Sequence, residues 1–84
     1  PDKAQLDVET HRVPFVHAAT IFGDPRSLTS FDPDHSEDED RFVTIGTSAG
    51  EVLLIVSHTD RDDRIRVISA RKATRRERRI YENG

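Results

Sequence analysis

The chain has 84 residues, of which 35% are charged and a quarter are Leu, Ile, Val or Phe, and its net charge is −3. This length allows one small domain, and the apolar fraction exceeds the level of about 20% below which a charged chain is usually disordered. The absence of cysteine excludes disulfides and thiolate metal sites. The longest apolar run, residues 52–56, is too short to span a membrane, and the start does not resemble a signal peptide. We expect one soluble, cytoplasmic domain over residues 1–84.

The two halves of the chain carry opposite charge. Residues 1–40 hold ten acids and three bases, whereas residues 41–84 hold ten bases and six acids. This asymmetry indicates either a surface in the second half that faces a polyanion, or two solvated faces that only help solubility.

Two helices are predicted before the first strand. Residues 3–12 have a weak apolar pattern, although Lys3, Asp7 and His11 would share one face. Pro14 suits the first turn of a second helix over residues 15–22, where apolar residues recur at i, i+3, i+4 and i+7. Gly23 can terminate this helix.

Four strands joined by hairpins are predicted next, over residues 26–31, 41–47, 51–58 and 64–70. Residues 32–40 contain six acids and form an exposed loop, and residues 60–63 form a polar turn. The apolar run at 52–56 predicts a central strand that is buried on both faces. The fold class is therefore α+β, with two amino-terminal helices on a four-stranded antiparallel sheet and a helix at the carboxyl end.

The last helix has a local start signal. Thr74 and Glu77 have the spacing of a capping box, in which each side chain bonds the backbone amide of the other residue. Capping explains Glu77 fully, and Ile80 and Tyr81 give the helix an apolar side.

A basic cluster runs from the last strand into this helix. Its members are Arg64, Arg66, Arg71, Lys72, Arg75, Arg76, Arg78 and Arg79. Guanidinium groups and a helix amino terminus both suit phosphate, and His58, expected near the same region, could move protons on a ribose 2′-hydroxyl. Alternatively, Arg66 only pairs with an acid, and His58 is a structural residue at the sheet edge. Strict strand alternation also separates Arg64 and Arg66 from Ser69 and Arg71, unless a bulge intervenes.

No other chemical motif stands out. The chain has no glycine-rich phosphate loop and no nucleophile elbow, and its four histidines lack metal-ligand spacing. We expect no metal and no cofactor.

The sequence resembles the BrnT family, ribonuclease toxins of bacterial type II toxin–antitoxin pairs with a RelE-like fold. The resemblance covers essentially the whole chain and is most specific near the carboxyl end. It is carried by the helix with Phe15, Ala18, Ala19 and Phe22 and by segments 22–25, 32–36, 41–46, 56–59 and 64–79, together with Tyr81. His58, Arg66, Ser69, Arg71, Glu77 and Tyr81 match family positions.

The amino end departs from the family pattern. Family members usually begin with a Phe-x-Trp-Asp strand, and this chain has no Trp. Lys3 and His11 match the first family helix, whereas Asp7, Thr10 and Arg12 replace Asn, Lys and Gly. Either the amino end is truncated, or this is a divergent member of the family.

The resemblance and the residues together predict a metal-independent endoribonuclease. Arg66 and Arg71 are expected to hold phosphate, His58 to transfer protons and Tyr81 to assist. The predicted RNA-binding residues are Arg64, Lys72, Arg75 and Arg76, and Thr74 and Glu77 form the cap. The resemblance implies a BrnA-like ribbon-helix-helix antitoxin in a hetero-oligomer, operator DNA contacted only through that antitoxin, and no membrane. The alternative is a toxin-fold domain of weak or no activity that binds antitoxin as a corepressor.

Overall fold

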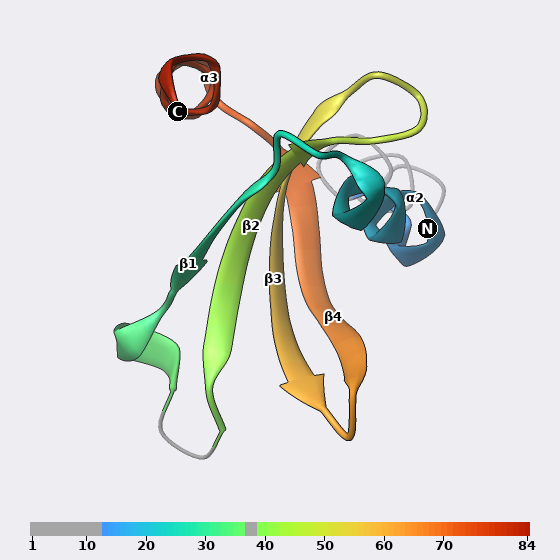
Figure 1. The fold of residues 1–84 in the computed structure, drawn as a ribbon, viewed down its shortest axis with the longest axis vertical. Helices are drawn as coiled ribbons and strands as arrows, with labels where there is room; N and C mark the ends of the chain where they lie inside the picture. The colour runs from blue at the N-terminus through green and yellow to red at the C-terminus, as the bar shows by residue number, and fades with distance from the viewer. Residues whose placement is uncertain (1–12, 37–38) are drawn as a thin grey trace, which may run out of the picture.

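The computed structural model describes residues 13–36 and 39–84, and its centre is a four-stranded antiparallel sheet (Figure 1). The strands lie side by side in chain order, so each pairs with the next along the sequence. Their bounds are Leu28–Phe31 for β1, Arg41–Thr47 for β2, Leu53–Arg61 for β3 and Arg64–Lys72 for β4. The predicted α+β class and the four-stranded antiparallel sheet are confirmed.

One helical segment precedes the sheet in the described ranges. The α-helix α2, Phe15–Ala18, continues directly as the 3₁₀ helix η1, Ala19–Gly23. It corresponds to the second predicted helix, and its tighter end fits the usual place of 3₁₀ turns at helix termini. The expectation of two amino-terminal helices is therefore corrected to one joined helix, and the helix predicted over residues 3–12 lies outside the described residues.

The sheet buries apolar side chains on both faces. On one face, Leu54, Val56 and Ala70 pack against Ala18 and Ile21 of the helical segment. On the other face, a second buried cluster contains Ile45, Leu53 and Ile55, with Tyr81 of the carboxyl-terminal helix packed against it. Strand β3 contributes side chains to both clusters, so the predicted central strand is confirmed. Its run of apolar residues is needed because the strand is buried on both faces.

The turn between β3 and β4 is tighter than the sequence suggests. Asp60 pairs with Ile65 and Arg61 with Arg64, so only Asp62 and Asp63 remain in the loop. These two residues have φ of 52° and 63°. Two-residue hairpin loops favour positive φ at both positions because that geometry matches strand twist, and Asp tolerates it better than most residues.

The first strand begins two residues later than expected. The side chain and carbonyl of Asp24 accept from the backbone amides of Arg26 and Ser27, at 2.9 and 3.1 Å, which holds this segment in a turn. The acidic segment that follows β1 contains a short 3₁₀ helix, η2, Pro33–His35.

The carboxyl-terminal helix α3, Arg75–Asn83, lies against one end of the sheet only (Figure 1). Tyr81 reaches Thr47 at the end of β2, which places α3 far from Arg41 at the start of that strand. Within the described ranges, no helix is long and apolar enough to cross a membrane.

Candidate functional site

A β-bulge in β4 decides which basic side chains share a face. Ser57 pairs with Ser69, but the next residue, His58, pairs with Val67, so Ile68 is an extra residue in β4. Because one extra residue shifts the alternation by one position, the residues on either side of the bulge come to lie on the same face.

The shared face carries the exposed side chains of Arg64, Arg66, Ser69 and Arg71. Their partners on β3 are Arg61, Thr59, Ser57 and Ile55, which alternate along one side of that strand. We call this the arginine face, and its members are Arg41, Ser57, Thr59, Arg64, Arg66, Ser69 and Arg71. Helix α3 packs on it at the Ile55 end, and among the described residues the end near the β3–β4 turn is open.

His58 lies on the opposite face, which we call the histidine face, with Leu54 and Val56. The residue is 3% exposed, and its ring packs edge-on against Phe22 and in a stack on Phe42, with ring centroids 4.9 and 5.9 Å apart. The expectation that His58 comes near the basic cluster is therefore wrong. The reason is alternation, since His58 is one residue away from Thr59, which faces the arginines.

The polar contacts of His58 are internal. Its Nε2 is 2.7 Å from the Thr44 hydroxyl, which in turn is 2.7 Å from the Thr29 hydroxyl. Its Nδ1 has no hydrogen-bond partner and lies 3.5 Å from a carboxylate oxygen of Asp60. Burial lowers the pKa of His58, and Asp60 opposes that effect only in part. The imidazole is a neutral core group with no route to the arginine face.

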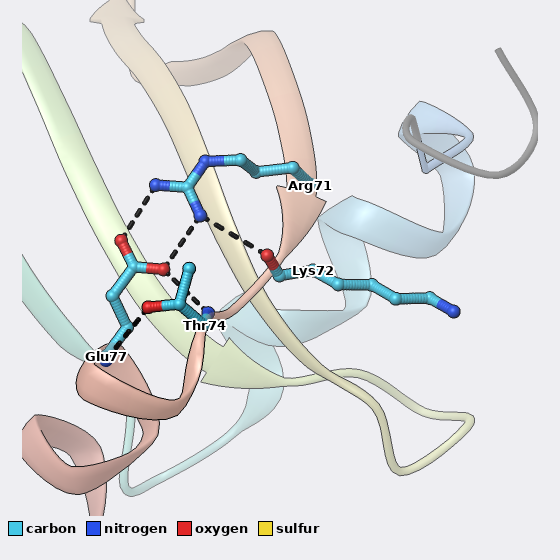
Figure 2. Close-up of polar contacts among 4 residues, drawn as sticks. All are labelled: Arg71, Lys72, Thr74 and Glu77. Atoms are coloured by element: carbon cyan, nitrogen blue, oxygen red, sulfur yellow. Dashed lines mark hydrogen bonds and ion pairs between the residues drawn. The ribbon is translucent and has the colours of Figure 1, made fainter. Parts of the chain in front are cut away.

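Arg71 is bound to the amino end of α3 (Figure 2). Its two terminal nitrogens each donate to one carboxylate oxygen of Glu77, at 2.7 Å. The same carboxylate accepts from the Thr74 amide at 2.9 Å, and the Thr74 hydroxyl accepts from the Glu77 amide at 3.2 Å, so the capping box is present. Chiefly because of the Arg71 hydrogen bonds, the pKa of Glu77 falls from 4.5 to about 2. Glu77 is thus a charged anchor for both Arg71 and the helix.

The Tyr81 hydroxyl forms hydrogen bonds within the fold. Its hydroxyl donates to Asp24 at 2.6 Å and accepts from the Thr47 hydroxyl at 3.2 Å. Asp24 additionally accepts from the Thr47 amide at 2.8 Å. These bonds, the one from Tyr81 first, lower the pKa of Asp24. The group connects α3 to the segment after η1, at the covered end of the sheet.

The remaining predicted RNA-binding residues lie in three places. Arg64 is on the arginine face beside the β3–β4 turn. Lys72 pairs with Leu54, and its side chain points away from Glu77 and Arg71 (Figure 2). Arg75 and Arg76 are exposed in the first turn of α3. The structure therefore brings Arg64, Arg66 and Arg71 to one face and separates His58 and Lys72 from them.

Two residues of the arginine face were not singled out from the sequence. Arg41 and Thr59 are direct cross-strand partners, and Thr59 also pairs with Arg66. The alternation of each strand was visible in the sequence, but their alignment requires the register between strands.

Among the described residues, no group of three His, Cys, Asp or Glu side chains could hold a metal ion.

The comparison with known families indicates a class of ribonuclease toxins. A protein-family model described as "Ribonuclease toxin, BrnT, of type II toxin-antitoxin system" matches residues 1–77. The chain belongs to the BrnT family. Among curated proteins, none matches this sequence.

Proposed function

We propose that this chain is a metal-independent endoribonuclease that binds RNA along the arginine face. The observation that carries the proposal is the bulge at Ile68, which brings Arg64, Arg66, Ser69 and Arg71 to one exposed side of β4. A row of guanidinium groups on an uncovered sheet face supplies the phosphate contacts that dominate nucleic-acid affinity. Membership in a ribonuclease toxin family supports the same assignment.

Arg66 and Arg71 serve different phosphates in this proposal. Their partners on β3, Thr59 and Ile55, are four positions apart, or about 13 Å at roughly 3.3 Å per residue, because the bulge adds one residue to β4. Arg71 is held by Glu77 near α3, whereas Arg66 forms no ion pair with any described residue. Arg66 is therefore the group that stabilises negative charge on the phosphate during cleavage, and Arg71 positions the strand.

Metal independence follows from the type of side chain on the arginine face. Arginine neutralises phosphate charge without a bound cation, and its fork of donors matches two phosphate oxygens. We therefore expect EDTA to leave the cleavage rate unchanged.

The partner we propose is a BrnA-like ribbon-helix-helix antitoxin, with operator DNA reached only through it. The family belongs to type II toxin–antitoxin systems, in which the toxin is paired with an antitoxin. A partner that binds only the folded toxin raises its stability by mass action. Saturating antitoxin should raise the melting temperature of the purified chain, and an unchanged melting temperature would contradict the pairing.

The test of the activity is cleavage of total RNA by purified chain in EDTA, with Arg66→Gln and Lys72→Gln side by side. Both substitutions remove one charge from an exposed position of β4, but on opposite faces. We expect cleavage by wild type and Lys72→Gln, and a large loss in Arg66→Gln. A folded wild-type chain that binds antitoxin and cleaves no RNA would instead be the corepressor-like interaction domain.

A further inference from the structure

The open end of the arginine face contains a row of three cross-strand neighbours. Arg41 on β2 pairs with Thr59 on β3, which pairs with Arg66 on β4. The three side chains lie on the same face because each pair is in direct register. Two arginine residues therefore flank one threonine in the sheet, at the end that α3 does not cover.

The hydroxyl of Thr59 has no partner among the described residues. The residue is 1% exposed, and its Oγ1 makes no hydrogen bond within the described structure. Buried polar groups are nearly always paired, because an unpaired one loses its bonds to water and gains nothing in return. An unsatisfied hydroxyl on a residue that pairs with two arginines indicates a place where a ligand oxygen could accept its hydrogen bond.

An anionic oxygen already lies beside this row. Glu39 accepts from Arg61 at 2.6 Å, and Arg61 is two residues beyond Thr59 on the same side of β3. The Arg61 hydrogen bond lowers the pKa of Glu39, and the charges of Arg61, Arg66 and Arg41 lower it further. The Glu39 carboxylate thus lies within the combined field of all three arginines.

We propose that Arg41, Thr59 and Arg66 bind one phosphate group of RNA, and that the Glu39 carboxylate competes with that phosphate for the arginines. This rests on the proposed function, and it identifies a phosphate position and an internal competitor for it. The guanidinium groups neutralise the phosphate, and the Thr59 hydroxyl donates to one of its oxygens.

The test is binding of a fluorescent 2′-O-methyl RNA oligonucleotide, which lacks the attacking hydroxyl, measured by anisotropy at several salt concentrations. Arg41→Gln and Arg66→Gln should each weaken binding about tenfold and reduce the salt slope by about 0.7. Glu39→Gln should tighten binding by up to about fivefold, the size of a surface ion pair. Glu82→Gln on α3 removes the same charge at the far end of the sheet and should have a smaller effect, because salt screens it.

Thr59→Val separates a ligand role from a structural one. Replacing an unpaired buried hydroxyl with a methyl group should keep or raise the melting temperature while weakening oligonucleotide binding. A lower melting temperature with unchanged binding would mean that the hydroxyl serves the fold. Circular dichroism of each variant ensures that only folded chains are compared.

The outcomes distinguish this inference from the ribonuclease assignment. Suppose that the wild-type chain cleaves RNA, but Glu39→Gln and Glu82→Gln change the oligonucleotide affinity equally, or Arg41→Gln binds as tightly as wild type. Either result would overturn the phosphate site at Arg41, Thr59 and Arg66 and leave the ribonuclease assignment intact. If the variants bind as predicted but the wild-type chain cleaves no RNA, the phosphate site is supported and the ribonuclease activity is contradicted. A wild-type chain that neither binds nor cleaves would overturn both.

Discussion

The two faces of the sheet use their polar residues in opposite ways. On the histidine face, His58 is enclosed by Phe22 and Phe42 and bonded to Thr44. On the arginine face, Arg66 is exposed and the neighbouring Thr59 hydroxyl lacks a partner. A buried imidazole that packs between aromatic rings and bonds Thr44 through one nitrogen stabilises the fold, whereas exposed charge beside an unsatisfied hydroxyl is available to a ligand. The adjacent β3 residues His58 and Thr59 therefore have different roles, one in stability and one in ligand binding, and the variants below test this difference.

Arg66→Gln should give the largest change in activity. Removing a preorganised positive charge from the cleaved phosphate should lower the cleavage rate by about 10²–10³-fold, with little change in melting temperature. The rate is measured on a labelled RNA that wild type cleaves, with Lys72→Gln as the matched control. An equal loss of cleavage rate in the two variants would mean that the two faces of the sheet contribute equally to cleavage.

His58→Ala should affect stability and leave turnover unchanged. The substitution removes a buried ring that packs against Phe22 and Phe42 and leaves the Thr44 hydroxyl with one partner fewer. We expect a loss of about 2–4 kcal/mol in the free energy of unfolding, the range for large-to-small core changes. Cleavage per folded molecule, measured at low temperature, should match wild type. A rate loss of about 10²-fold in folded protein would restore His58 as a proton-transfer group.

Acid should weaken the histidine face. Burial lowers the pKa of His58 below 6.5 in the folded chain, so the unfolded chain binds this proton more readily. The stability contributed by neutral His58 is complete above pH 6.5 and is lost as the pH falls through the lower folded pKa. The slope reaches at most about 1.4 kcal/mol per pH unit for one proton. Urea unfolding between pH 7 and 5 measures it, and a wild-type slope in His58→Gln would assign the effect to other groups.

Glu77→Ala should have a moderate effect at the covered end of the arginine face. It removes half of the capping box and both hydrogen bonds from Arg71 to the Glu77 carboxylate. We expect a loss of about 0.5–2 kcal/mol, as for other weakened caps, visible in the melting temperature and the helical circular dichroism signal. Glu82→Ala, in the last turn of α3, is the control. An unchanged melting temperature would show that the cap contributes nothing.

Tyr81→Phe should produce the smallest effect. The ring keeps its packing on the Ile45, Leu53 and Ile55 cluster, and only the hydroxyl bonds to Asp24 and Thr47 are lost. The expected loss is about 0.5–1.5 kcal/mol in unfolding free energy, with the cleavage rate unchanged. A selective loss of cleavage would indicate a chemical role for the hydroxyl.

Local features of the fold were predictable because neighbouring residues determine them. The capping box needs only Thr74 and Glu77 three positions apart, and it is present. The central strand follows from an apolar run that no half-exposed strand would carry. The two-residue loop was predicted too long, because Asp60 and Arg61 are polar and yet belong to β3.

The site was predicted less completely, because its residues meet through strand register. Arg66 and Arg71 were identified by type, and the family resemblance pointed to the same segment. Whether they share a face depended on a single extra residue, Ile68, which no composition or periodicity signals. Tyr81 was assigned to chemistry, but its hydroxyl bonds Asp24, 57 positions away in the chain.

The sequence by itself determined the four strands, the cap, the α+β class and the family of this protein, since these depend on local spacing and on motifs. Only the tertiary structure decided the roles of side chains along β3 and β4. Successive strand residues point to opposite faces, so a one-residue bulge moves a side chain between the core and the solvent. That geometry buries His58, exposes Arg66 and, within residues 13–36 and 39–84, leaves the hydroxyl of Thr59 unpaired in the row between Arg41 and Arg66.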